Sequence, residues 1–139
     1  MDHKHLPEMA RFAGLEHEPL FTPMVAGYYK GMVVYVPLSR AHLDRPVDAN
    51  DVREVLAERY ADEPCVQVAP TQPLDCLDEG YLDPEAANDT NRVDLMVFGS
   101  AEQVLIAARL DNLGKGAAGA AVQNLNLMLG QPELEGLIR

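Results

Sequence analysis

The segment from Leu110 to Gly130, which reads LDNLGKGAAGAAVQNLNLMLG, constrains the fold more than any other part of the chain. It follows an apolar run at Val104–Ala108 and places three glycines and a lysine among small residues. Apolar side chains then recur at helical spacing, at Val122, Leu125, Met128 and Leu129. This order predicts a strand that leads into a helix with free backbone amides in its first turn. Such a turn suits a phosphate or a carboxamide oxygen.

Residues Gly114 to Gly119 match the pattern G-x-G-x-x-G of dinucleotide-binding loops, but the surrounding sequence argues against that fold. A dinucleotide-binding unit needs a further strand, with an acidic residue about 20 positions further on. The residues after this helix run only to Arg139, which leaves no room for that strand. We therefore expect no Rossmann unit here.

Helices and strands are expected to alternate along the rest of the chain without an internal repeat. The expected helices are Leu6–Ala13, Asp51–Tyr60 with Asp48 as N-cap, and Leu113–Met128. The expected strands are Leu20–Pro23, Lys30–Pro37, Val66–Ala69, Val93–Gly99 and Gln103–Leu110. Residues 71–91 are expected to form a long loop, with one helical turn at Pro84–Ala87 as an option. Together these helices and strands predict a single α+β domain, in which helices pack on one face of a mixed or antiparallel sheet.

The charge of the chain limits its partners. Its 139 residues include 22 acidic and 11 Lys or Arg side chains, so the formal net charge is −11. Nucleic-acid binding needs clustered basic residues to neutralise phosphates, so we expect no nucleic-acid partner. No apolar run approaches the roughly 20 residues that span a bilayer, and no signal-peptide pattern opens the chain. We therefore expect a cytoplasmic protein with no membrane contact and, because Cys65 and Cys76 lack metal-site spacing, no bound metal.

Four motifs follow one another in an order that is typical of one enzyme family. They are His3-Lys4-His5-Leu6-Pro7-Glu8-Met9, Phe21–Met24 followed by Gly27–Gly31, Asp89–Leu95, and the segment from 110 to 130. Together they resemble the N-acetyl-γ-glutamyl-phosphate reductases, NADPH-dependent acyl-phosphate reductases of arginine biosynthesis. The resemblance implies the C-terminal catalytic and oligomerisation domain of such an enzyme, similar to that of glyceraldehyde-3-phosphate dehydrogenase-type reductases. It also implies a homo-oligomer that acts on a small acyl phosphate, with NADP held mainly by a separate N-terminal domain.

The histidine motif is where the resemblance places the chemistry. An acyl-phosphate reductase needs an imidazole beside its thiolate, to activate the thiol and to exchange a proton with the substrate oxygen. The resemblance implies His5 as this catalytic base, with His3, Lys4 and Glu8 beside it as substrate-binding residues. From the residues alone, a frayed and solvated N-terminus without a role is the simpler interpretation.

At the start of the C-terminal helix, the resemblance places Asn112, Lys115 and Gly116 near the nicotinamide end of the cofactor. Asn112 could hydrogen-bond the carboxamide, and Lys115 could hold an anionic group or pair with Asp111. The alanines around Gly119 could simply allow close helix packing. Residues 111–130 are expected to form a helix that packs on the cofactor domain.

The chain also departs from the family pattern. The family's nucleophilic cysteine lies in a Gly-Cys-small-Thr setting before the histidine motif, whereas Cys65 and Cys76 follow His5 and lack those neighbours. We therefore expect a C-terminal piece that is inactive alone, with the apolar side of its last helix exposed or covered by another copy. Two alternatives stay open: a noncatalytic oligomerisation module of the same fold, and the domain of a sister reductase for aspartyl or aminoadipyl phosphate.

Overall fold

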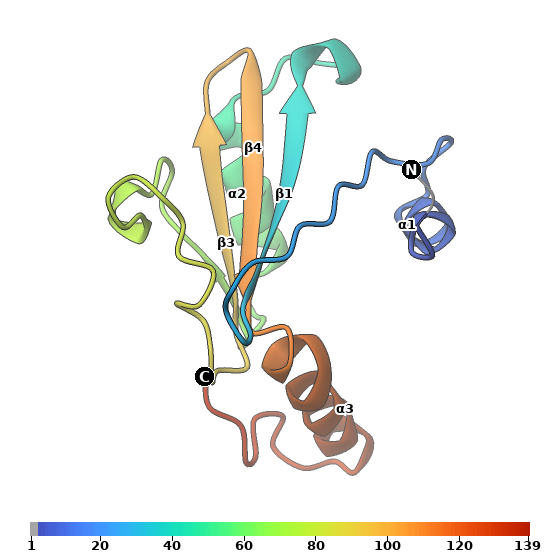
Figure 1. Ribbon diagram of the computed structural model, residues 1–139, viewed down its shortest axis with the longest axis vertical. Helices are drawn as coiled ribbons and strands as arrows, with labels where there is room; N and C mark the ends of the chain where they lie inside the picture. Colours follow the sequence, from blue (N-terminus) through green and yellow to red (C-terminus); the bar gives the residue numbers. More distant parts are fainter. Residues whose placement is uncertain (1–2) are drawn as a thin grey trace.

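A mixed four-stranded sheet forms the centre of the protein (Figure 1). The computed structural model describes residues 3–139. Within them the elements follow in the order α1 (Leu6–Ala13), β1 (Met32–Ser39), η1 (Arg40–His42), α2 (Ala49–Arg59), β2 (Val66–Val68), η2 (Leu74–Cys76), β3 (Val93–Gly99), β4 (Gln103–Leu110), η3 (Gly114–Ala118) and α3 (Gly119–Met128). The α+β class expected from the sequence is confirmed.

The strands lie in the order β1-β4-β3-β2. β4 pairs antiparallel with both β1 and β3, whereas β2 runs parallel to β3. Pro37 is tolerated in β1 because this strand lies at the edge, where a missing amide breaks no ladder. The sheet is therefore mixed. Leu110, at the end of β4, pairs with Met32, at the start of β1.

Helix α2 covers one face of the sheet. Its N-terminus is fixed by a capping box, in which Asp48 accepts from the amides of Asn50 and Asp51, and Asp51 accepts from the amide of Asp48. The helix packs Ala49 against Val97 and Val104, both of which are buried. Side chains alternate between the two faces along a strand. Val97 and every second residue of β3 therefore lie on the α2 face, as do Val104 and every second residue of β4.

Of the three α-helices, only α2 packs extensively on the sheet. α3 continues from β4 and leaves the sheet at its lower end, while α1 lies beside β1 and apart from it (Figure 1). Within residues 3–139, α1 packs extensively against no strand or other helix. The sheet therefore has a second face that no helix covers.

Three local expectations were wrong. Residues Leu20–Pro23 form no strand, because the flanking Pro19 and the final Pro23 supply no amide to a ladder. Pro84–Ala87 forms turns rather than a helix. The C-terminal helix begins as a π-helical turn, η3, rather than as a regular α-helix from Leu113.

Large apolar side chains remain exposed at many positions, among them residues of α3 and of β1. On α3 these include Leu125, 52% exposed, and Met128, 83% exposed. On β1, Tyr35 is 48% exposed and lies opposite the buried Ala107, on the face away from α2. None of the helices in residues 3–139 has both the length and the apolar composition needed to cross a membrane.

Candidate functional site

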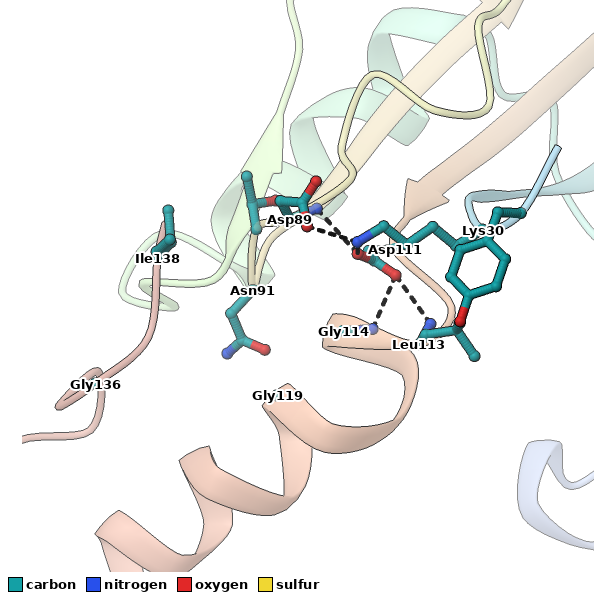
Figure 2. Close-up of a pocket in the computed structure, with 11 residues that line it drawn as sticks. Lys30, Asp89, Asn91, Asp111, Leu113, Gly114, Gly119, Gly136 and Ile138 are labelled. Atoms are coloured by element: carbon teal, nitrogen blue, oxygen red, sulfur yellow. Dashed lines mark hydrogen bonds and ion pairs between the residues drawn. The ribbon is translucent and has the colours of Figure 1, made fainter.

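Asp111 lies at the centre of the candidate site, directly after β4 ends. Its side chain is 1% exposed. Oδ1 accepts hydrogen bonds from the backbone amides of Leu113 at 2.9 Å and Gly114 at 2.8 Å. Figure 2 shows this oxygen directed at the start of the C-terminal helix and the other directed at Asp89 and Lys30. One carboxylate therefore joins three segments of the chain.

The second oxygen of Asp111 binds the two distant segments. Oδ2 accepts from the backbone amide of Asp89 at 2.9 Å and lies 3.1 Å from Lys30 Nζ. Lys30 Nζ also donates to Asp89 Oδ1 at 2.6 Å. Asp89 has a left-handed backbone, with φ of 62°, which aspartate adopts more readily than most residues. Its main chain and its side chain thus both take part in the cluster.

Asp111 and Lys30 keep their charges at neutral pH. Burial raises the pKa of Asp111, but the hydrogen bonds from the backbone of Asp89 and Gly114, the Lys30 ammonium and the Leu113 amide outweigh it and lower this pKa from 3.8 to about 2. Hydrogen bonds to Asp89 and Asp111 raise the pKa of Lys30 above its ordinary value. The site therefore holds an ion pair across the physiological range.

Asn112 is fixed by the segment that precedes β1. Its Oδ1 accepts from the amide of Gly31 at 2.8 Å. Gly31 has a φ of 111°, and a Cβ there would meet the carbonyl oxygen of Pro84 at 2.5 Å, so this position requires glycine. Within residues 3–139, Asn112 Nδ2 has no hydrogen-bond partner, so this amide nitrogen stays available as a donor.

The first turn of the C-terminal helix is wound as a π-turn. The amide of Gly116 donates to the carbonyl of Asp111, and that of Ala118 donates to the carbonyl of Leu113. Such turns occur often at functional sites. The amides at Leu113, Gly114 and Gly116 are therefore already bonded, and the expectation of free amides was wrong at these positions because Asp111 itself accepts all three.

Lys115 belongs to a second network along the helix. Its Nζ donates to Gln123 Oε1 at 2.5 Å, and Asn91 Nδ2 donates to the same oxygen at 3.0 Å. Gln123 Nε2 donates to Glu133 Oε1 at 2.6 Å. Lys115 is therefore not the partner of Asp111 that the sequence suggested, because Lys30, from a distant segment, pairs with that carboxylate.

A pocket of about 440 Å³ lies against the Asp111 cluster. Its lining includes Lys30, Asp89, Asn91, Asp111, Gly119 and Ile138 (Figure 2). Among the described residues, the buried Oδ1 atom of Asn91 has no hydrogen-bond partner. That oxygen faces Gly119, where any Cβ would collide with it. None of the four residues predicted at the histidine motif lines this pocket.

The histidine motif forms a separate group at the start of α1. The rings of His3 and His5 meet edge to face with centroids 4.9 Å apart, and His3 also contacts Phe21 at 4.7 Å. His5 is the N-cap residue of α1, while Lys4 and Glu8 are exposed. The structure brings the two histidines together, but α1 lies apart from the start of α3 (Figure 1).

The two cysteines differ in their exposure, and Cys65 is not placed as a nucleophile. Cys65 is 2% exposed and its Sγ accepts from Asn91 Nδ2 at 3.4 Å. Cys76 is half-buried in η2. A reactive thiol needs access to solvent and substrate, which the buried Cys65 lacks.

Sequence reasoning missed Lys30 and Asp89 as members of the site. Both lie inside motifs quoted for the resemblance, but their charges become informative only when the fold brings them to Asp111. Asp111 itself could have been found from the local sequence. An aspartate just before a helix commonly caps it by accepting from the amides two and three residues further on, here those of Leu113 and Gly114.

Comparisons with known proteins place this fold in a family. A family model described as semialdehyde dehydrogenase, dimerisation domain, matches residues 1–112, and the chain belongs to this family. The match confirms the class of protein that the motifs indicated, and a dimerisation domain supports the expected homo-oligomer.

Individual relatives sharpen the comparison. The chain is 48% identical over 138 residues to the N-acetyl-gamma-glutamyl-phosphate reductase 2 of a Nostoc species, covering 97% of this chain and 43% of that protein. It is 46% identical, with the same coverage, to the N-acetyl-gamma-glutamyl-phosphate reductase of Trichormus variabilis. A Burkholderia orbicola protein of that name is 44% identical over 132 residues, 94% of this chain and 42% of its own length. The chain thus spans less than half the length of these relatives.

Proposed function

We propose that the polypeptide carrying this chain reduces N-acetyl-γ-glutamyl phosphate to N-acetylglutamate semialdehyde with NADPH, in the arginine biosynthesis of the cytoplasm. In this proposal the chain is the C-terminal catalytic and oligomerisation domain. The observation that carries it is the identity of 48% over nearly the whole chain to a reductase of that name, with the histidine motif and the Asn112 turn both present.

The start of the C-terminal helix fits the nicotinamide end of NADP. A carboxamide offers an oxygen that accepts hydrogen bonds, and Asn112 has a donor, Nδ2, without a partner in residues 3–139. Lys115 lies three residues further on, with its ammonium held by Gln123. Bound NADPH would supply a hydride for the substrate. We assign Asn112, Lys115 and Gly116 to this contact.

His5 would act as the acid–base group. Its imidazole would take the proton of a nearby thiol, give a proton to the substrate's carbonyl oxygen when the hydride adds to the carbonyl carbon, and take it back when the aldehyde leaves. His3, whose ring contacts that of His5, would bind the substrate together with Lys4 and Glu8. Because α1 lies apart from the sheet, a cofactor domain seated between α1 and α3 would bring His5 and Asn112 to one substrate.

The exposed apolar surfaces fit two further contacts. The face of the sheet away from α2, with Tyr35 on it, would form the homodimer. The exposed apolar side of α3, which includes Leu125 and Met128, would pack on the cofactor domain. In both contacts, apolar side chains that are exposed in the isolated chain would be buried.

The test is an assay of the complete polypeptide that contains these 139 residues. NADPH oxidation is followed with N-acetyl-γ-glutamyl phosphate, and separately with aspartyl phosphate and with aminoadipyl phosphate. We expect turnover with the acetylglutamyl substrate at a far higher kcat/KM than with the other two. A preference for either of the other two substrates would identify a sister reductase. No turnover with any of the three would favour the noncatalytic oligomerisation module.

A further inference from the structure

We infer that Asp111 is a positioning residue for the nicotinamide end of the cofactor, because it fixes the turn that presents the Asn112 amide. This inference rests on the proposed function and adds a residue that does not itself touch the cofactor. Two independent contacts carry it: the carboxylate of Asp111 holds the turn after Asn112, and the amide of Gly31 holds the Asn112 side chain.

The first contact sets the backbone around Asn112. Asp111 Oδ1 accepts from the amides of Leu113 and Gly114, two and three residues further on, at 2.9 and 2.8 Å. The peptide of Asn112 lies inside this loop of hydrogen bonds, so its backbone has little freedom. Charge-assisted hydrogen bonds of this kind are shorter and stronger than neutral ones.

The second contact sets the amide of Asn112. Because the Gly31 amide donates to Oδ1, the two ends of the Asn112 side chain are distinguished, and Nδ2 is the end left to bind a carboxamide oxygen. Gly31 directly follows Lys30, whose ammonium pairs with Asp111 Oδ2. The same carboxylate thus anchors the turn and the segment that orients Asn112.

This arrangement predicts that Asp111 controls cofactor affinity through geometry. A displaced binding group loses much of its contribution even when it is chemically intact, and a site depends on the residues that lock its rotamers. Replacing Asp111 by asparagine retains one acceptor for the Leu113 and Gly114 amides. It removes the charge and places a donor against the amide of Asp89 or against Lys30.

The test compares Asp111→Asn with Asp48→Ala in the complete polypeptide. Asp48 caps α2 and lines a pocket with Ser100, at the opposite end of the sheet from η3, so its replacement destabilises the fold without touching the Asn112 turn. NADPH binding is measured by titration without substrate, and amide hydrogen exchange is measured over residues 111–118. For Asp111→Asn we expect the Kd for NADPH to rise about 10–100-fold and exchange at Leu113 and Gly114 to accelerate. For Asp48→Ala we expect a Kd within about twofold of wild type.

Other outcomes decide against the inference. Equal changes of Kd in both variants would mean that Asp111 acts only through overall stability, and unchanged exchange at Leu113 and Gly114 would mean that it does not hold the turn. If Asp111→Asn does not fold, Lys30→Met removes only the cation and should raise Kd in the same direction; an unchanged Kd there would overturn the inference. If wild type binds NADPH but reduces no acyl phosphate, the proposed function fails while the affinity comparison still decides the role of Asp111.

Discussion

Lys30 Nζ lies 3.1 Å from Asp111 Oδ2, so the segment before β1 is tied to the start of the C-terminal helix. Asp89 completes the cluster, since it binds the lysine through its side chain and the carboxylate through its amide. Three motifs that are far apart in the sequence therefore meet at one buried charge. This relationship explains why the Asn112 turn has a fixed shape although it lies beyond the end of the sheet.

The stability of the protein should depend on the charge of Asp111. The pKa of Asp111 in the folded protein, about 2, is below its ordinary value of 3.8, so the folded state binds fewer protons than the unfolded state in this window. The contribution of Asp111 is therefore complete above about pH 4 and is lost as the pH falls towards 2. Urea unfolding of wild type and Asp111→Asn should differ by about 1–3 kcal/mol at pH 7 and converge near pH 2. A difference that stayed constant down to pH 2 would contradict this account.

Two glycines of the C-terminal helix should respond to alanine in opposite ways. A Cβ at Gly119 would collide with the side-chain oxygen of Asn91, so Gly119→Ala should lower the free energy of unfolding by about 1–3 kcal/mol. At Gly116 the nearest atoms to a Cβ lie at 3.5 Å, an ordinary contact, so Gly116→Ala should be neutral or stabilising. Thermal and chemical unfolding of the pair checks this, and equal losses in both variants would be inconsistent with the packing described.

The isolated chain should oxidise no measurable NADPH. Loss of a nucleophile costs many orders of magnitude, and the thiol of Cys65 is buried while Cys76 lacks the Gly-Cys-small-Thr setting of the family's nucleophile. The measurement is turnover by the purified 139-residue chain with N-acetyl-γ-glutamyl phosphate. Activity that vanished on replacing Cys65 or Cys76 by serine would overturn this prediction.

The chain should form a homodimer. Tyr35 is half-exposed on the face of the sheet that no helix covers, and exposed apolar patches on soluble proteins usually mark contact surfaces. The net charge of −11 opposes association, but physiological salt screens it beyond about 8 Å. Sedimentation at micromolar concentration should show a dimer that Tyr35→Glu weakens, whereas a wild-type monomer would remove the interface.

Much of the fold could be predicted from local patterns. The bounds of α1, β3 and β4 follow from helical or strand periodicity closed by strong stop signals, such as Gly14 after α1, which adopts the left-handed conformation. The Asp48 cap of α2 was also predicted, because an aspartate before a helical pattern acts through its nearest neighbours alone.

The rest depends on contacts between distant segments. The start of the C-terminal helix is held by the carboxylate of Asp111, which accepts from the amides of Leu113 and Gly114. That carboxylate pairs with Lys30, which no local sequence pattern joins to it. The position of α1 depends on contacts with residues outside α1. The distance between His5 and Asn112 depends on the same contacts. The roles of His5, His3, Lys4 and Glu8 therefore stay predictions.

The roles of the two histidines can be separated in the complete polypeptide. His5→Ala should lower kcat by roughly 10²–10⁴-fold, as expected for loss of an acid–base group, while His3→Ala should act mainly on KM. Steady-state kinetics of both variants with N-acetyl-γ-glutamyl phosphate provide the measurement. A large kcat loss in His3→Ala with a mild effect in His5→Ala would exchange the two assignments.

The most direct test of the proposed function is growth of a bacterium that lacks its own N-acetyl-γ-glutamyl-phosphate reductase, on medium without arginine. The complete polypeptide that contains this chain should restore growth, and the same polypeptide with His5→Ala, expressed to the same level, should not. Failure of the wild-type polypeptide to restore growth while it is folded and abundant would contradict the assignment to arginine biosynthesis, and equal growth with both would contradict the role given to His5.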